Sequence, residues 1–326
     1  MAEWRNVVVE SAGQVAQGVV DLHLVACDAN KLSPAAAGAH VDVRLSNGLI
    51  RQYSIHHYDE ETGSYHLGVG LAEPSRGGSA FIHNELKTGH TLKVSLPRNH
   101  FALDETATGF VFIAGGIGIT PILSMIRWCR THGRPWRMLY CVRSQTRAAY
   151  LADLTESDRV LLHADDEQQG RPDLLSFIAL AGKGEHLYCC GPGPLMDAVE
   201  ALAGESMPSR QVHFERFSAP ASSKIPDATQ VDKSFRVKLA LSDLELTVPP
   251  DSSVLDVLEA AGVMAPFSCR EGMCRTCECT VLDGEVDHRD FVLSDQERAS
   301  NKVMLPCVSR ASSSMRSRST SRSSHS

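Results

Sequence analysis

The chain has 326 residues, of which 43% are hydrophobic and 22% charged, and its formal net charge is −7. This composition excludes a disordered or fibrous chain, and the acidic balance argues against a nucleic-acid partner. The first residues lack the apolar stretch of an export signal, so the ten cysteines are expected in a reducing cytoplasm, where clustered cysteines favour metal binding over disulfides.

The first block, 1–105, is expected to form an antiparallel β-barrel. Residues 41–45, 65–69 and 91–96 alternate apolar and polar side chains, and Gly, Asn and Pro separate such runs. This period of two is typical of strands with one buried face, and short strands with tight turns favour a small barrel.

Two motifs inside this block carry candidate binding residues. They are Arg51, Tyr53 and Ser54, followed by Arg76, Gly77, Gly78 and Ser79. The second motif could seat a phosphate, because Ser79 is expected to cap a helix over 80–86. Arg51 could add a charge-assisted contact, and Tyr53 could lie against a flat ring. An Arg beside a Tyr on a barrel strand is equally the pattern of an ordinary surface pair.

The second block, 106–217, alternates strands and helices and predicts a doubly wound α/β domain with a parallel sheet. The expected strands are 110–114, 136–142, 160–163 and 186–190, and the clearest helix is 194–202. The run 109–126 is uncharged and long enough for a membrane span, but its central glycines divide it into strand, turn and helix. No membrane span is therefore expected.

Two glycine turns in this block each follow a strand and open a helix. The first contains Gly115, Gly116, Gly118, Thr120 and Pro121, and the second contains Cys190, Gly191 and Pro192. Such turns let the backbone approach a pyrophosphate at a helix N-terminus, with Thr120 as the expected N-cap and Pro121 as the first helical residue. The first turn does not match the G-x-G-x-x-G motif, so the commonest kind of dinucleotide-binding fold is not implied. Cys190 could also be an ordinary core residue, because free cysteines are commonly buried.

Residues 218–232 lack periodicity and are expected to form a linker. The third block, 233–311, begins with a predicted hairpin, and Ser253 and Ser294 each start a capping-box pattern at a helix. The Ser/Arg-rich tail, 312–326, has almost nothing apolar to bury and is expected to be disordered.

The cysteines of the third block match the spacing of a plant-type [2Fe–2S] site. Cys269, Cys274 and Cys277 fit C-x₄-C-x₂-C, and Cys307 lies in a later apolar run, 303–308, that is expected to be a strand. A structural zinc site is the alternative, although zinc usually takes paired C-x₂-C knuckles. Cys279 is an alternative to Cys277 as the third ligand, but its spacing from Cys274 does not match the plant-type pattern.

The fourteen histidines show no metal-binding pattern in the sequence. His56 and His57 are adjacent on an expected strand, where alternation would point their rings to opposite faces. No H-E-x-x-H motif or facial triad is found, and no G-x-S-x-G elbow supports a serine hydrolase.

Taken in chain order, the motifs resemble the phthalate dioxygenase reductase family, over residues 1 to about 311. This family includes the reductase components of vanillate O-demethylase, toluenesulfonate monooxygenase and phenoxybenzoate dioxygenase. The resemblance implies an FMN-binding barrel, an NAD-binding α/β domain and a β-grasp ferredoxin domain. It also implies an NADH-dependent oxidoreductase that passes electrons through FMN and [2Fe–2S] to a partner Rieske-type oxygenase.

The resemblance also implies site roles. Arg51, Tyr53, Ser54 and the motif from Arg76 to Ser79 would bind FMN, with Ser54 near its N5 edge. The first glycine turn would bind NADH, with Thr120 and Cys190 near the nicotinamide. The other residues expected at this site are Arg143, Ser144, Gly191, Pro192 and Glu215. Phe217 would lie near the flavin, and the metal ligands would be Cys269, Cys274, Cys277 and Cys307.

The sequence departs from the family at two places. Arg275 stands in the cluster loop where relatives usually carry Gly, and a Ser/Arg tail replaces a short terminal strand. Arg270 and Arg275 are also candidates for a basic docking patch. Coenzyme choice is open, since Arg143 and Ser144 could suit NADPH, whereas the resemblance favours NADH.

Two other functions stay open. The chain could be a stand-alone NAD(P)H reductase of quinones, nitro compounds or ferric chelates, which would not need the attached ferredoxin-like block. It could also be an electron carrier or binding module without turnover, although both glycine turns argue against this.

Overall fold

The computed structural model describes residues 3–28, 30–154, 156, 158–168, 170–217 and 233–312. The chain divides into two compact units, Met1–Phe217 and Ser218–Ser326. The expected linker over 218–232 and nearly all of the expected disordered tail lie outside the described residues.

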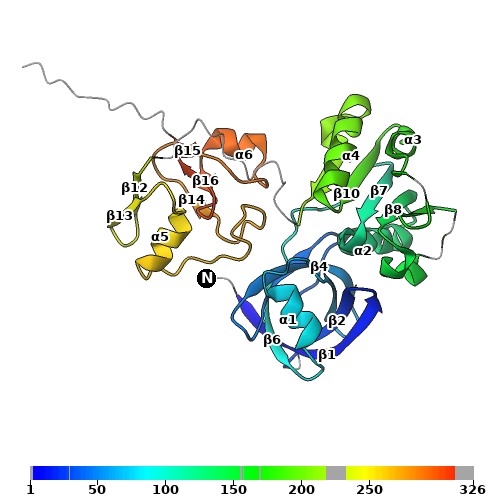
Figure 1. The fold of residues 1–326 in the computed structure, drawn as a ribbon, viewed down its shortest axis with the longest axis horizontal. Coiled ribbons are helices and arrows are strands. Elements are labelled where there is room, and N and C mark those ends of the chain that lie inside the picture. The colour runs from blue at the N-terminus through cyan, green and yellow to red at the C-terminus, as the bar shows by residue number, and fades with distance from the viewer. Residues whose placement is uncertain are drawn as a thin grey trace, which may run out of the picture. The chain divides into compact units, whose positions relative to one another are not determined.

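The first unit opens with a closed antiparallel barrel in the order β1-β2-β5-β4-β3-β6 (Figure 1). The strands are β1 Trp4–Ala16, β2 Val19–Ala26, β3 His40–Arg44, β4 Ile50–Asp59, β5 Ser64–Gly70 and β6 Thr91–Ser95. Alternate side chains, such as Val41 and Val43 of β3, are fully buried in the barrel core. The barrel predicted from the period of two is confirmed.

A five-stranded parallel sheet follows, in the order β11-β10-β7-β8-β9. Its strands are β7 Gly109–Gly115, β8 Trp136–Val142, β9 Val160–Ala164, β10 Glu185–Cys190 and β11 Val212–Glu215. The central strand β7 is buried along its whole length, as its continuous apolar run predicts. The predicted α/β domain is therefore confirmed.

Helices cover both faces of this sheet. Phe110 and Phe112 of β7 pack against helix α2, and Val111 and Ile113 pack against helices α3 and α4 on the other face. The helices and 3₁₀ turns of this unit are α1 Gly78–Asn84, η1 Gly116–Gly118, α2 Ile119–Thr131, η2 Gln145–Arg147, η3 Leu151–Asp153, α3 Leu174–Ala179, α4 Gly193–Ser206 and η4 Ser209–Gln211. Among the described residues, none of the helices combines the length and the apolar character that crossing a bilayer requires.

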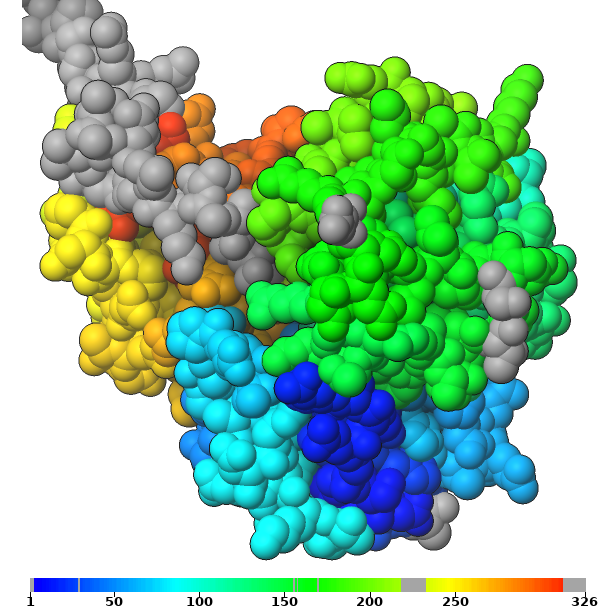
Figure 2. All heavy atoms as spheres, turned by 45° about the vertical axis from the view of Figure 1, so that its right-hand side comes forward, coloured from blue at the N-terminus to red at the C-terminus, as the bar shows by residue number. Residues whose placement is uncertain are grey.

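The barrel and the parallel sheet pack directly against each other within the first unit, as the blue-to-cyan and green surfaces in Figure 2 show. The Ser124 hydroxyl of α2 accepts a hydrogen bond from the amide of Gly38 at 2.8 Å. The amide of Gln17, between β1 and β2, donates to the carbonyl of Thr146 at 2.9 Å. These contacts fix the strand ends of the sheet against the barrel.

The second unit consists of short strands and two helices around two small apolar cores. Its elements are β12 Phe235–Leu239, β13 Leu244–Val248, α5 Val254–Ala260, β14 Cys279–Thr280, β15 Val286–Asp287, α6 Asp295–Ser300, β16 Val303–Met304 and β17 Arg310–Ala311. Both predicted capping boxes form, with Ser253 and Ser294 accepting hydrogen bonds from the amides of Asp256 and Glu297.

The prediction of a strand over 303–308 is wrong. Strand β16 ends at Met304, and Cys307 lies in a turn whose Val308 and Ser309 amides both donate to the carbonyl of Leu305. Pro306 has no backbone N–H with which to continue the strand pairing of β16. Its carbonyl instead accepts a hydrogen bond from the amide of Leu255 in α5.

Candidate nucleotide and iron–sulfur sites

Three strands of the parallel sheet end side by side at one edge. Cys190, the last residue of β10, pairs in register with Ala114 of β7 on one side and with Glu215 of β11 on the other. The carboxyl ends of parallel strands are where ligands bind in folds of this type. The two glycine turns therefore meet at the same edge as the Cys190 thiol and the Glu215 carboxyl.

The glycines of the first turn have separate physical roles. A Cβ on Gly118 would overlap the carbonyl of Cys190, and one on Gly115 would lie 2.5 Å from the Cδ of Pro192. These two glycines let the turns pack against each other. Gly116 has a φ of +51° and nothing within 4 Å of an added Cβ, so its backbone is the part of the turn that a ligand could approach.

The expected N-cap at Thr120 is wrong. Helix α2 begins at Ile119, with Gly118 at the N-cap, and no side chain caps it. The 3₁₀ turn η1 leads straight into the helix, and the Thr120 hydroxyl donates to the carbonyl of Ile117 at 3.0 Å. Pro121 is therefore the third helical residue, and the backbone N–H groups at the start of α2 have no side-chain acceptor.

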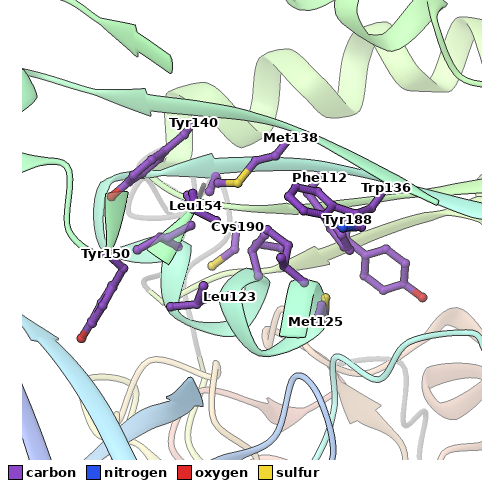
Figure 3. Packing of buried hydrophobic residues seen from close by; sticks show 14 of the residues in the cluster. Phe112, Leu123, Met125, Trp136, Met138, Tyr140, Tyr150, Leu154, Tyr188 and Cys190 are labelled. Carbon is purple, nitrogen blue, oxygen red and sulfur yellow. The ribbon is translucent and has the colours of Figure 1, made fainter. Parts of the chain in front are cut away.

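Cys190 is fully buried within the apolar core between the sheet and α2. Figure 3 shows it among Leu123, Tyr140 and Leu154. Burial raises the pKa of its thiol well above the ordinary value, and the carboxyl of Glu215 adds to the shift. The side chain is thus a protonated thiol at neutral pH.

Glu215 lies where the sheet meets the barrel. Burial raises the pKa of its carboxyl to about 8, against the opposing effect of the nearby Ser54 hydroxyl of β4. The imidazole Nδ1 of His40, a residue of β3, is 3.7 Å from Oε1 of Glu215. Burial, with the charge of Arg98, lowers the pKa of His40 to about 3. At neutral pH this site therefore holds a protonated carboxyl beside a neutral imidazole.

Several buried polar atoms at this junction have no hydrogen-bond partner of good geometry within the described residues. They are Ser54 Oγ, Glu215 Oε2, and both ring nitrogens of His40. Unsatisfied buried polar groups cost about 1–3 kcal/mol each, so their gathering here indicates a place where a polar ligand belongs. This is the observation that fits a flavin and a nicotinamide at the junction of barrel and sheet.

The motif from Arg76 to Ser79 forms the start of helix α1, with Gly77 as N-cap at a φ of +87°. The guanidinium of Arg51 crosses this turn and donates to the carbonyl of Arg76 at 2.7 Å. A Cβ on Gly78 would lie 2.6 Å from Cγ of Arg51, so only glycine leaves room for this side chain. The turn and a cation therefore lie together, as a phosphate site requires.

The expected cap at Ser79 is wrong. Ser79 is the second residue of α1, and its hydroxyl accepts from the amide of Ala72 at 3.2 Å and bonds to the Ser75 hydroxyl at 3.0 Å. Gly77 can adopt a left-handed conformation, which starts the helix two residues earlier than the serine pattern predicts.

The remaining expected residues follow β8 and β11 or lie on β4. Arg143 and Ser144 follow β8, where Arg143 is exposed and the Ser144 hydroxyl bonds to that of Thr146 at 2.9 Å. Tyr53 is two residues from Arg51 on β4, and Phe217 is 44% exposed just after β11. Burial raises the pKa of Tyr53 far above its ordinary value, so its hydroxyl stays protonated.

In the second unit the four expected cysteine ligands approach as two pairs. Cys269 contacts Cys274, whose pKa falls to about 6 because the Cys269 thiol donates to it. Cys277 contacts Cys307 in the same way, and the pKa of Cys277 is lowered. The four thiols thus meet as two pairs, and it is as thiolates that they would bind iron.

The four sulfurs are spaced as two pairs and not as one group. Among the described residues, no three of these sulfurs lie within 4.8 Å of one another. A single tetrahedral zinc ion would bring all four to about 3.8 Å of each other, given Zn–S bonds of about 2.3 Å. Two separate pairs fit a cluster with two irons, each bound by one pair.

The loop around this site directs amides at sulfur. The amides of Glu271 and Met273 donate to the Cys269 sulfur at 3.3 and 3.4 Å. Gly272 between them has a φ of +70°, and a Cβ there would lie 2.7 Å from the Val308 side chain. Hydrogen bonds to the ligating sulfurs tune an iron–sulfur cluster, so this loop belongs to the metal site.

Arg275 adopts the left-handed conformation, with a φ of +55°, which explains why glycine suits its position. Its guanidinium donates to Glu278 and Glu297, both at 2.7 Å. Arg270 is bound by two carboxylates in the same way, those of Asp256 and Glu259. Each guanidinium is thus paired with two carboxylates, and the expected basic docking patch stays a prediction.

Sequence reasoning missed two groups near the barrel. His40 carries no motif that would connect it with Glu215, since the two residues are far apart in the chain. Asp21, His56 and His66 gather on three neighbouring strands, although the sequence shows no histidine cluster. Only pairing of β2, β4 and β5 brings these three together, and no short-range pattern records it.

Comparison with known proteins gives two family matches. Residues 112–201 match the oxidoreductase NAD-binding domain, and residues 237–312 match the 2Fe-2S iron-sulfur cluster binding domain. The first match covers most of the parallel sheet but not β11, and the second covers the cysteine pairs.

Similar proteins include "phenoxybenzoate dioxygenase subunit beta" from Ectopseudomonas oleovorans, 44% identical over 85% of each chain. "Tetrachlorobenzoquinone reductase" from Sphingobium chlorophenolicum is 42% identical over 84% of this chain and 85% of its own. Among solved structures, phthalate dioxygenase reductase is 36% identical with a TM-score of 0.71, over 95% of this chain and 96% of its own. That structure is described as modular, for electron transfer from pyridine nucleotides to [2Fe-2S].

Proposed function

The chain belongs to the phthalate dioxygenase reductase family, and from this premise we propose that FMN carries electrons between NADH and its [2Fe–2S] cluster. It is an oxidoreductase that passes electrons from a pyridine nucleotide to [2Fe–2S]. A flavin accepts two electrons as a hydride and releases them one at a time, which is the form that an iron–sulfur cluster accepts. The observation that supports this most directly is the pairing of four cysteine thiols in a chain that also carries the nucleotide turns.

The residues of each site follow from the geometry above. FMN would be held by Arg51, Tyr53, Ser54, Arg76, Gly77, Gly78 and Ser79. NADH would be held by Gly115, Gly116, Gly118, Thr120, Pro121, Arg143, Ser144, Cys190, Gly191, Pro192 and Glu215. Phe217 would lie near the flavin. The cluster would be held by Cys269, Cys274, Cys277 and Cys307.

The chain's own contribution to hydride transfer is positioning in an environment of few charges. Cys190 presents a protonated thiol, and Glu215 a protonated carboxyl, at the edge where the nicotinamide would lie. A nicotinamide would become positive on losing hydride and a flavin would gain negative charge, so neutral groups there would avoid repelling the charge on the flavin and could donate hydrogen bonds to it. Ser54 would contribute a hydroxyl from the barrel side, and holding the two rings close together would supply the orientation that the transfer needs.

The proposed domains are an FMN-binding barrel over 1–105, an NAD-binding domain over 106–217 and a ferredoxin domain over 233–311. A linker over 218–232 would join the last two. The electron acceptor would be a Rieske-type oxygenase, as the oxygenase systems of the relatives suggest. The cytoplasm suits this role, because it contains the NADH pool and keeps thiols reduced.

An anaerobic NADH titration of the purified protein tests this proposal. Oxidised flavin and iron–sulfur absorbance should both be present, and both should bleach with NADH. A parallel NADPH titration tests coenzyme choice, and we expect at least tenfold weaker use of NADPH. A folded protein without flavin, or a cluster that NADH does not reduce, would refute the proposed electron path.

A second candidate is reduction of a small quinone, because one relative bears the name of a tetrachlorobenzoquinone reductase. The two functions would take electrons from different cofactors of the chain. A quinone could leave with electrons from the flavin, whereas an oxygenase would take them from the cluster. Quinone reduction that is unchanged in Cys307→Ser would favour a flavin exit, and loss of oxygenase reduction in the same variant would favour the cluster.

A further inference from the structure

A cavity of about 550 Å³ lies between the barrel and the loop after β8, and the residues that line it include none of the two glycine turns. Asp21, His56, His57 and His66 line it from the barrel side, and Tyr150 lines it from the parallel-sheet side. We name these five residues the histidine pocket. None of them is among the residues assigned to FMN, NADH or the cluster.

We propose that the histidine pocket is a binding site for a divalent late first-row metal such as zinc, nickel or copper, with Asp21, His56 and His66 as ligands. One ligand atom from each of the three residues lies within 4.8 Å of the others. Two imidazoles and one carboxylate on one side of an open cavity form a known arrangement for such metals, which prefer imidazole nitrogen.

The carboxylate of Asp21 is the centre of the pocket. Its Oδ1 accepts hydrogen bonds from Nε2 of His56 at 2.6 Å and from the Tyr150 hydroxyl at 2.8 Å. Its Oδ2 faces Nδ1 of His66 at 3.3 Å. A metal would take the imidazole lone pairs that a change of tautomer provides, while Tyr150 remains as the hydrogen-bond donor that orients the carboxylate.

A β-bulge directs the extra histidine into the pocket. The register of β4 against β5 shifts between Ile55 and His57, so one residue is added on β4. Both His56 and His57 therefore line the same cavity, and the expectation that their rings point to opposite faces is wrong. Bulges commonly re-aim side chains at functional sites, and this one adds a third imidazole to the cavity.

The guanidinium of Arg127 lines the cavity, but it is paired with the carboxylate of Asp153 at 3.2 Å.

Copper EPR on the oxidised, untagged holoenzyme tests the proposal. Oxidised flavin and oxidised [2Fe–2S] give no EPR signal, so about one equivalent of Cu²⁺ can be read without overlap. We expect nitrogen splittings from at least two imidazoles. Dialysis against zinc should give one ion per chain, with affinity at least tenfold weaker in His66→Gln and unchanged in His90→Gln, an exposed control.

Chemical modification of individual histidines in the wild-type chain gives a second test, which does not depend on whether a variant folds. Zinc should protect the ligand His66 from diethyl pyrocarbonate, read by peptide mass spectrometry, and should leave the exposed His90 reactive. Three results would each overturn the proposal: no protection, copper bound through sulfur alone, or equal zinc affinity in folded His66→Gln.

Discussion

Cys190 and Glu215 are register partners at the ends of parallel strands β10 and β11, so a buried thiol and a carboxyl lie side by side at one edge of the sheet. Burial raises the pKa of both groups, and that of Glu215 reaches about 8. The edge where the nicotinamide is proposed to lie is thus uncharged at neutral pH. This has a consequence for stability that can be measured.

Glu215→Gln should remove a pH-dependent loss of stability. The ordinary pKa of this carboxyl is 4.5, so the unfolded chain ionises Glu215 well below pH 8, whereas the folded chain keeps its proton until about pH 8. Wild-type stability should therefore fall, relative to the variant, as pH rises from about 4.5 to 8 and then level off. The difference should reach up to about 3 kcal/mol at pH 7.

Urea unfolding at pH 5, 7 and 8.5 measures this difference. Glu205→Gln, which removes an exposed carboxylate from the same unit, is the matched control and should show little change. A difference between Glu215→Gln and wild type that does not vary with pH would show that Glu215 is already ionised in the folded chain.

Cys307→Ser should lose most of its iron, because it breaks one of the two sulfur pairs. Cys279→Ser should keep two irons per chain, since Cys279 is exposed and has the wrong spacing for the site. Iron analysis and visible absorbance of the two purified variants make the comparison. Iron retained by Cys307→Ser, or lost by Cys279→Ser, would mean that the ligand set is wrong.

Gly118→Ala should damage the nucleotide site without touching any charged group. The added Cβ would meet the carbonyl of Cys190, so the two glycine turns must move apart. We expect about 1–3 kcal/mol of lost stability and at least a tenfold loss of NADH-dependent flavin reduction. Gly204→Ala in helix α4 meets open space and should instead stabilise the chain by about 0.5–1 kcal/mol. Stopped-flow reduction and thermal melting check both variants, and equal behaviour of the two would contradict this account.

Arg275→Gly and Arg275→Ala separate backbone strain from ion pairing. Both variants lose the contacts with Glu278 and Glu297, but only glycine relieves the left-handed backbone. Arg275→Ala should therefore be less stable than Arg275→Gly by about 1 kcal/mol. Urea unfolding, monitored through the absorbance of the cluster, measures this difference in stability. If alanine proves the more stable, the loop must adopt a right-handed backbone at this position.

The sequence predicts best where one short segment decides the structure. The buried strand β7 and the capping box at Ser253 depend on neighbouring residues only, and both form as expected. The caps expected at Thr120 and Ser79 fail because glycines just before them begin the helices earlier. The side-chain preference of Ser and Thr is worth about 1 kcal/mol, which a glycine turn overrides.

Long-range pairing decides what the sequence could not predict. The cysteine spacing predicts a metal loop, and the structure adds that the thiols meet in pairs. The β-bulge at His56, by contrast, can be recognised only from the register of β4 against β5. Asp21 and His66 are likewise brought together by strand order, for which single-residue patterns carry no information.

The second unit has little regular structure of its own. Beyond its capped helices, its described strands form only two-stranded ladders, and Cys277 and Cys307 are themselves part of one of its two small cores. Isolated two-stranded ladders are only marginally stable in water, and metal binding then contributes directly to the free energy of folding. Iron supply would therefore act as a checkpoint on maturation: polypeptide made during iron starvation would hold a finished first unit and a second unit open to proteolysis.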